Sequence, residues 1–173
     1  IIMWDSMNRA DDMINILEPD MRTFGLDPAD IKVILLSHGH FDHYGGSRYL
    51  QDTYGAEVYM SEDDIPTMNA PNRDGSPKDP ATLPILDGYL ADRDVITFGD
   101  LTFEFAATPG HTPGSMSFVV NVTAFDGTAH KLCNWGGTNY PRDLAGMLDY
   151  KDSVAYFSDF IAERNVDVEL SMH

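Results

Sequence analysis

Blocks of apolar residues separated by polar ones predict strands and helices in alternation. The apolar runs at residues 1–6 and 31–37 are too short for typical helices and predict buried strands, the second covered on both faces. Between them, apolar residues recur at helical spacing, so we expect a helix over 8–24 that Gly25 ends. The pattern therefore predicts alternating strands and helices in the first part of the chain.

The rest of the chain predicts further elements of both kinds. Residues 62–94 are rich in Pro, Asp, Asn and Gly, which is typical of a long surface loop, either a functional lid or a disordered segment. We expect, in order, a helix over 45–56 closed by Gly55, a strand over 57–61, a hairpin over 95–108 turning at Gly99-Asp100, a hairpin over 115–135 turning at Asp126-Gly127, a helix from Tyr150 to Arg164 and a strand over 166–171.

Composition narrows the class of protein. The 173 residues suffice for one domain, residues 1–173, and hold 28 acidic against 11 basic side chains, a formal charge of −17. So acidic a chain argues against nucleic acid or an anionic membrane as partner. No run approaches the roughly 20 apolar residues of a membrane span. Cys133 is the single cysteine, so no internal disulfide can form, and we read it as a small buried side chain.

Both ends of the sequence fall inside predicted strands. The chain opens at Ile1 without an initiator Met and stops at His173. We therefore expect a domain truncated at both ends, with any targeting signal outside the sequence.

The stretch "SHGHFDHYGG", residues 37–46, places four candidate metal ligands directly after a buried strand. These are His38, His40, Asp42 and His43. Imidazole and carboxylate groups suit zinc, with iron or manganese possible. The strand is expected to end in extended backbone, which would direct His38 and His40 the same way. Gly45 and Gly46 are expected to let the chain turn tightly into the next helix.

"HGHFDH" matches the HxHxDH signature of the metallo-β-lactamase superfamily. "TPGHTPGS", residues 108–115, resembles its second signature and places His111 in the third histidine's position. "IIMWDS" resembles the preceding strand, with Asp5 at its end, and "VDVELSMH" resembles the strand that ends in the last ligand, His173, although Met172 stands where Asn is usual. The resemblance implies an α/β (α+β) fold, the αββα sandwich of two mixed sheets, present here as an incomplete portion.

The resemblance also implies two metal sites. Its ligands would be His38, His40 and His111 for the first zinc, and Asp42, His43 and His173 for the second. Most relatives bridge the metals with Asp, or in one subclass with Cys, but here the matching position is Gly137 or Thr138. The sequence thus resembles the lactamase subclass with three-His plus Asp-His-His zinc sites and no bridging Asp or Cys.

The function implied is that of a dinuclear zinc hydrolase. It would cleave an amide or β-lactam bond, or an ester or lactone, in a small-molecule substrate, using a hydroxide held between the metals. Asp42 would orient that hydroxide, and Asp5 would either fix a ligand loop or simply cap its strand. The alternatives are a mononuclear iron oxidoreductase on the same fold and a metal-binding protein without turnover.

The surroundings of the site are less specified. Tyr44, Tyr140 and residues 62–94 are candidates for the substrate groove, whereas His130 reads as a surface residue. The resemblance to the lactamase subclass favours a periplasmic or secreted protein. The oligomeric state stays open.

Overall fold

A computed structural model describes residues 1–171, in which the chain divides into two compact units, Ile1–Tyr89 and Leu90–His173. Each unit is described by itself.

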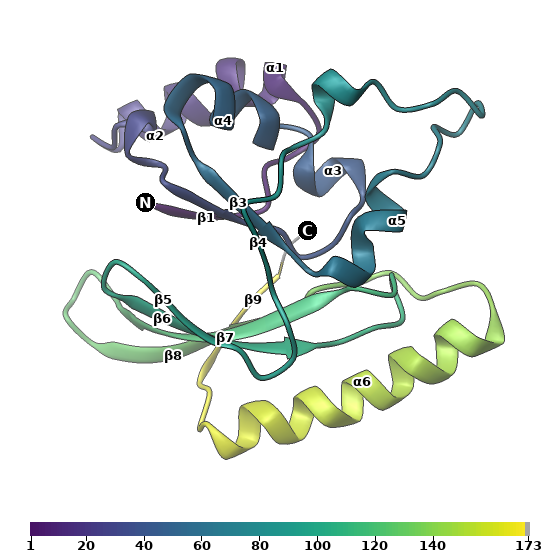
Figure 1. Ribbon diagram of the computed structural model, residues 1–173. Helices are drawn as coiled ribbons and strands as arrows, with labels where there is room; N and C mark the ends of the chain where they lie inside the picture. The colour runs from purple at the N-terminus through teal and green to yellow at the C-terminus, as the bar shows by residue number, and fades with distance from the viewer. Residues whose placement is uncertain (172–173) are drawn as a thin grey trace. The chain divides into compact units, whose positions relative to one another are not determined.

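The first unit is built on a parallel sheet (Figure 1). Its strands are, in sheet order, β1 (Ile2–Trp4), β2 (Val33–Leu35), β3 (Glu57–Met60) and β4 (Gly88–Tyr89). All three residues of β2 are buried, which confirms the expectation of a strand covered on both faces. The candidate ligands follow this central strand.

Helices cover one face of the parallel sheet (Figure 1). The expected first helix is present as three continuous segments, α1 (Ala10–Asp12), the π-helical η1 (Met13–Leu17) and α2 (Glu18–Thr23), and α4 (Ser47–Tyr54) lies beside it. Gly25 and Gly55, with φ of 74° and 68°, end these helices as predicted, because glycine adopts positive φ without strain. The core beneath them includes Met13, Ile34 and Leu50, none of which is exposed.

The segment expected to be one long loop contains regular structure. Residues 62–94 hold the 3₁₀ helix η3 (Glu62–Asp64), α5 (Ile65–Met68), the 3₁₀ helix η4 (Pro80–Thr82) and strand β4. Two further short helices were not expected, the 3₁₀ helix η2 (Pro28–Asp30) and α3 (Phe41–Tyr44). Turns this short leave little periodicity in a sequence, whereas Pro and Gly stand out in it.

The reason expected for Gly45 and Gly46 was wrong. Both have ordinary negative φ, −62° and −91°, so neither supplies a special turn conformation. Instead, a Cβ at Gly45 would overlap the carbonyl group of Asn8, and one at Gly46 would overlap the carbonyl oxygen of Ser6. The glycines allow α3 to lie directly against the chain that leaves β1.

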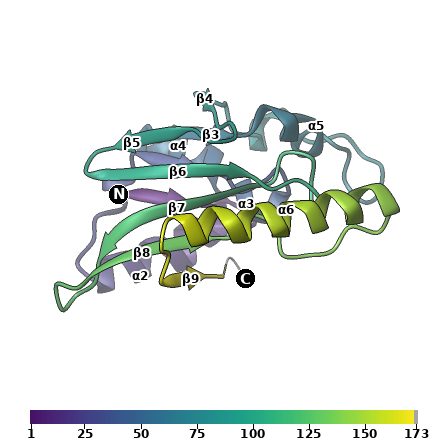
Figure 2. The same ribbon diagram turned by 90° about the horizontal axis from the view of Figure 1, so that it is seen from below.

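The second unit is a largely antiparallel sheet with one long helix on it. The strands are β5 (Val95–Phe98), β6 (Leu101–Ala107), β7 (Met116–Thr123), β8 (Ala129–Asn134) and β9 (Val168–Leu170), and only the β8–β9 pair is parallel. Gly99 and Gly127 lie at the two expected hairpin turns with positive φ. Figure 2 shows helix α6 (Leu144–Glu163) running along this sheet.

Helix α6 begins earlier than the predicted Tyr150. It begins at Leu144, because an Asp143 carboxylate oxygen accepts a 2.9 Å hydrogen bond from the amide of Gly146 and caps the first turn. Phe157 and Phe160 anchor the helix against Val119 and the other buried side chains of the sheet.

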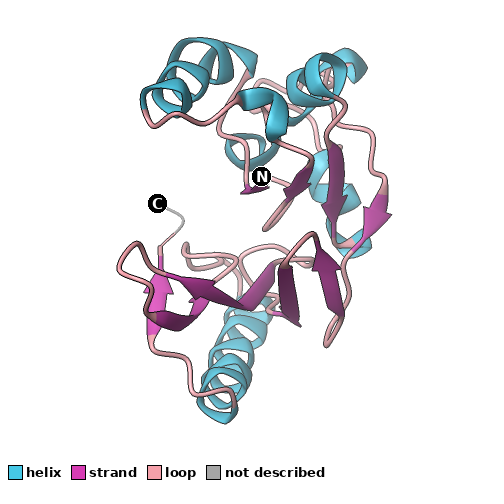
Figure 3. Ribbon diagram, turned by 90° about the vertical axis from the view of Figure 1, so that its left-hand side faces the viewer, coloured by secondary structure: helices cyan, strands magenta, loops and turns pink. Residues whose placement is uncertain are grey.

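Two sheets and their helices, coloured by type in Figure 3, give the mixed α/β architecture predicted from the sequence. The expectation that both sheets mix strand directions was half right, since among the described residues the first sheet is parallel throughout. None of the helices in residues 1–171 combines the length and apolarity needed to span a membrane.

Candidate metal centre

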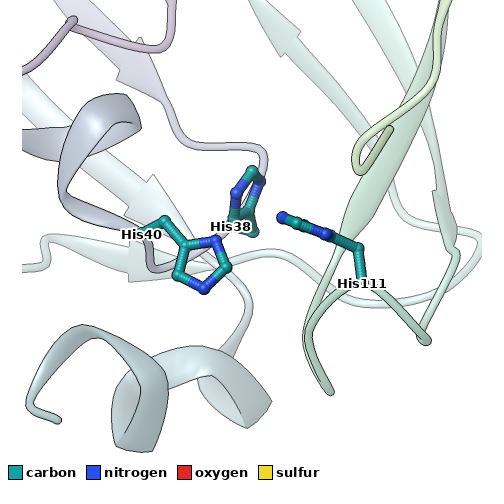
Figure 4. A group of neighbouring side chains, drawn as sticks. All are labelled: His38, His40 and His111. Atoms are coloured by element: carbon teal, nitrogen blue, oxygen red, sulfur yellow. The ribbon is translucent and has the colours of Figure 1, made fainter. Parts of the chain in front are cut away.

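The loop after β2 carries two of the predicted ligands, His38 and His40 (Figure 4). His38 is buried, with 1% of its surface exposed, and His40 is partly exposed. Their rings meet edge to face, with centroids 4.9 Å apart. His43, on α3, is also buried, and its ring centroid lies 3.9 Å from that of His38. The first unit therefore gathers three imidazoles within a few residues of the end of β2.

Asp5 ties the end of β1 to this loop. One of its carboxylate oxygens accepts a 2.8 Å hydrogen bond from the amide of Ser37. The other accepts from the Ser37 hydroxyl at 2.9 Å and lies 2.8 Å from Nδ1 of His43. The hydrogen bonds predicted between Asp5 and the ligand loop are thus present. They go beyond a plain strand-end cap.

Ser37 extends the same network to His38. Its hydroxyl donates to Asp5 and lies 2.9 Å from Nδ1 of His38, so it accepts the proton of that nitrogen. The neutral ring of His38 then carries its lone pair on Nε2. Nδ1 of His43 donates to Asp5 in the same way and gives His43 the same tautomer. Ser37 was missed in the sequence, where the serine directly before "HGH" was the available signal.

The network also decides the charge balance at His43. Burial lowers the pKa of its imidazole, but the hydrogen bond and charge of Asp5, with the nearby charge of Asp42, outweigh burial and raise the pKa above its ordinary value. The carboxylates of Asp5 and Asp42 therefore stabilise positive charge at His43.

Asp64 holds the middle of the HxH segment and was not predicted. It is fully buried, and its carboxylate accepts hydrogen bonds from the amide of Gly39 and, at 2.9 Å, from the hydroxyl of Thr67. Gly39 has no room for a side chain, because a Cβ there would lie 2.8 Å from the amide nitrogen of Met68 on α5. The turn between His38 and His40 is therefore held by a segment that the sequence presented as loop.

The remaining ligands of the predicted second metal are only partly described. The side chain of Asp42 is 39% exposed, and its carboxylate lies 3.6 Å from Nε2 of His43. His173 lies outside the described residues, as does Met172.

His111 belongs to the second unit, in the loop between β6 and β7 (Figure 4). Its Nδ1 lies 2.9 Å from the carbonyl oxygen of Asn139. A carbonyl only accepts, so Nδ1 carries the proton and Nε2 the lone pair. The tautomer matches that of His38, but here it is set by the backbone.

Gly137 is the position that lies against His111. A Cβ added there would be 2.5 Å from Cβ of His111 and 3.0 Å from Cγ, closer than van der Waals contact allows. Position 137 therefore faces the candidate ligand and has no room for a side chain with His111 in its present place. Thr138 is exposed, and its carbonyl oxygen accepts from the hydroxyl of Tyr150 at 3.4 Å.

The other residues singled out in the sequence have structural partners. Cys133 is buried, and burial raises the pKa of its thiol, as expected of a packed side chain. Tyr140 is exposed and packs edge-on against Tyr150. His130, predicted to be an ordinary surface residue, is partly exposed and lies 2.9 Å from a carboxylate oxygen of Asp167. Tyr44 is buried on α3.

The sequence model of the metallo-β-lactamase superfamily matches residues 2–123, well over half of the chain. The chain belongs to this superfamily. The match covers Asp5, the HxHxDH segment and His111.

Relatives within the superfamily carry out more than one reaction. A hydroxyacylglutathione hydrolase, GloC of Haemophilus influenzae, is 27% identical over 147 residues, covering 80% of this chain and 66% of that protein. The mitochondrial persulfide dioxygenase ETHE1 of Bos taurus is 39% identical over 64 residues, covering 36% of this chain and 25% of its own.

Solved structures show the same fold. BJP-1, a subclass B3 metallo-β-lactamase of Bradyrhizobium japonicum, has a TM-score of 0.77 at 24% identity, covering 98% of this chain and 66% of its own. The chain thus spans just under two thirds of the length of both GloC and BJP-1.

Proposed function

We propose that this superfamily member is a metal-dependent hydrolase that holds two zinc ions. His38, His40 and His111 would hold the first ion, each through one imidazole nitrogen (Figure 4). Asp42, His43 and His173 would hold the second. Iron or manganese would fit the same donor types.

One observation carries the proposal: three of the candidate histidines are oriented through Nδ1. Ser37 accepts from His38, Asp5 accepts from His43 and the carbonyl of Asn139 accepts from His111. Each neutral ring then presents Nε2. Metal-binding histidines are characteristically held in this way by a carboxylate or carbonyl behind the ring.

The residues present fit a zinc hydrolase. When bound, the metal pair would acidify a water molecule and polarise the carbonyl group of the substrate. Asp42, whose carboxylate is partly exposed, would orient the attacking water by accepting its proton in a hydrogen bond. Asp5 and Ser37 would keep the imidazoles in their tautomers throughout.

We propose an amide or β-lactam as the preferred substrate class, with esters and lactones as alternatives. The support is the absence of a carboxylate or thiolate at Gly137 and Thr138, which leaves the metal pair more positive than an Asp bridge would. The structural likeness to BJP-1 shows the fold alone, so the substrate rests on this residue pattern. A periplasmic or secreted location is part of the same proposal.

An iron oxidoreductase is the second candidate, favoured by the segment similar to a persulfide dioxygenase. The lack of a carboxylate at Gly137 disfavours it, because one metal ligand would be missing. A metal-binding protein without turnover is the third.

Elemental analysis of the protein and a screen of amide, lactam, ester and thioester hydrolysis test these candidates. Two zincs per chain with metal-dependent hydrolysis supports the proposal. One iron per chain would replace it with the oxidoreductase, and two zincs without any turnover would leave only metal binding.

A further inference from the structure

The first unit contains a pocket of about 540 Å³ that none of the candidate metal ligands lines. Its walls come from residues 8–11, from α3 and α4, and from residues 72–82. Pockets that hold small organic molecules commonly measure about 300–1,000 Å³. The pocket is therefore large enough for a ligand of its own.

The charge of the pocket differs from that of the protein. The whole chain has 11 Lys and Arg residues and 28 Asp and Glu residues. In the pocket lining the basic residues are in the majority: they are Arg9, Arg48 and Lys78, against the carboxylates of Asp11 and Asp52. Both carboxylates are exposed to water. An anion would therefore find at this pocket a local excess of positive charge on a chain that otherwise repels it.

Lys78 is held in place at this pocket. Its ammonium nitrogen donates a 3.0 Å hydrogen bond to the hydroxyl of Tyr44 and lies 5.6 Å from the centre of that ring. It lies at a similar distance, 5.7 Å, from the ring of Phe41. Tyr44 is itself fixed, because it is buried and its hydroxyl donates to the carbonyl of Met68 at 3.3 Å. A lysine ordered in this way loses little additional side-chain entropy when it binds an anion.

The other two cations differ in how strongly they are engaged. Arg48 is paired through Nε with both carboxylate oxygens of Asp52, each at 3.0 Å, so its charge is partly compensated. Arg9 is exposed, with no ion pair to any residue that the structure describes. An ammonium has three N–H donors, and the hydrogen bond to Tyr44 uses one of those of Lys78. Lys78 and Arg9 are therefore the two cations of the lining whose charge no neighbouring carboxylate compensates among the described residues.

The apolar part of the lining indicates what the ligand carries besides its anionic group. Phe41 is half exposed, and Tyr44 and Tyr49 belong to the same lining. Aromatic faces favour a flat apolar group through stacking and burial. A bare inorganic ion would leave this surface in water.

We propose that the pocket binds a small organic anion, with a carboxylate or phosphate held by Lys78 and Arg9 and a flat apolar group against Phe41. The proposal goes beyond the proposed hydrolase function and does not depend on it, because no metal ligand contributes to the pocket.

Isothermal titration calorimetry on the metal-free protein, with the chelator dialysed away, tests the proposal. Benzoate and phenyl phosphate supply the two head groups on one ring, benzamide supplies the ring without the charge, and inorganic phosphate supplies the charge without the ring. We expect one or both aromatic anions to bind at least about tenfold more tightly than benzamide and inorganic phosphate, the size of one charge-assisted hydrogen bond. The tighter of the two identifies the head group.

Variants test whether the aromatic anion binds at this pocket. Lys78→Met keeps the apolar stem and removes the charge, and should weaken binding of the aromatic anion about tenfold. Lys78→Arg should retain most of the affinity. Arg73→Met is the matched control, since Arg73 is an exposed cation on the same segment that does not line the pocket. Thermal unfolding of each variant checks that it folds.

Equal binding of benzamide and benzoate would overturn the proposal. So would an affinity that Lys78→Met leaves unchanged, an equal loss in Arg73→Met, binding that appears only after zinc is restored, or no binding of either aromatic anion.

Discussion

The two units hold their candidate histidines by different means. In the first, side chains do it: Asp5 and Ser37 accept hydrogen bonds from the imidazoles, and Asp64 fixes the backbone between His38 and His40. In the second, the backbone does it, through the carbonyl of Asn139 and the bare Cα of Gly137. A carboxylate and a backbone carbonyl can orient a ring equally well, but they respond differently to mutation. Side-chain supports can be removed one at a time, whereas a backbone support changes only when the chain moves.

The largest effect is expected from Asp5→Ala, which removes the acceptor of three hydrogen bonds. Buried donors on Ser37 and His43 would be left without it, at a cost of about 3–5 kcal/mol of unfolding free energy. Zinc content should fall with stability. Denaturant unfolding and elemental analysis measure both effects, with Asp20→Ala, an exposed acidic residue on α2, as control. Full zinc content in Asp5→Ala would show that the network does not orient the ligands.

Asp64→Ala should come next. It leaves the amide of Gly39 buried without its carboxylate partner, which should cost about 2–3 kcal/mol and loosen the turn between His38 and His40. Asp64→Asn keeps an acceptor oxygen and should recover part of the loss. The exposed neighbour Asp63 provides the control Asp63→Ala. Competition with a chromogenic chelator reads out zinc affinity apart from activity, and equal affinities for Asp63→Ala and Asp64→Ala would contradict this role.

Gly137→Ala tests the backbone support of the second unit. The new Cβ would lie too close to His111, so the ring must shift and zinc affinity should fall about tenfold with less than ~1.5 kcal/mol lost from stability. Thr138→Ala is the matched control on the neighbouring residue. If Gly137→Ala binds zinc as tightly as Thr138→Ala does, the contact does not position the ring.

The crowding at Gly137 also decides where a bridging carboxylate can be introduced to test the charge of the metal pair. An Asp installed to bridge the metals fits poorly at Gly137, so Thr138→Asp is the variant to use. We expect wild-type protein to lose its second metal first under mild chelation, because Asp42 is the single anionic ligand proposed for it. In Thr138→Asp the chelator concentrations that remove the second and the first metal should lie closer together. Simultaneous loss of both metals from the wild type would argue against separate sites.

The smallest effect on zinc affinity is expected at Glu18, a buried carboxylate remote from the candidate ligands. Burial raises the pKa of Glu18, but hydrogen bonds from Tyr49, Tyr54 and Arg22 outweigh it, and the net pKa lies below its ordinary value of 4.5. Glu18 therefore contributes stability that is fully present above the unfolded-state pKa and is lost as pH falls through the lower folded-state pKa.

Glu18→Gln should cost about 1–2 kcal/mol at neutral pH, with zinc affinity unchanged. Unfolding curves from pH 7 to 3 should show the difference from wild type shrinking below about pH 4.5. A difference that is constant over this range would mean that the charge of Glu18 contributes nothing.

The sequence was sufficient to predict an element wherever residues close together in the chain determine it. Buried strand β2 followed from its apolar run, and the ends of two helices and the turns of two hairpins followed from glycines that take positive φ. The start of α6 was predicted too late, at Tyr150, because Asp143 caps the helix one turn and a half earlier, at Leu144. The candidate metal-binding motif could be recognised because four candidate ligands lie within six residues, 38–43.

What surrounds those ligands was decided only by the tertiary structure. Ser37 is one residue from His38, but its partner Asp5 is separated from it by a whole helix, and Asp64 reaches Gly39 from a segment that looked like loop. Nothing local marks either pairing, because a buried hydrogen bond depends on which strands become neighbours in the sheet. Gly45 and Gly46 make the same point, since packing rather than their own conformation requires them. The sequence by itself determined which groups are candidate metal ligands. The parallel pairing of β1 with β2 determined how those of the first unit are held.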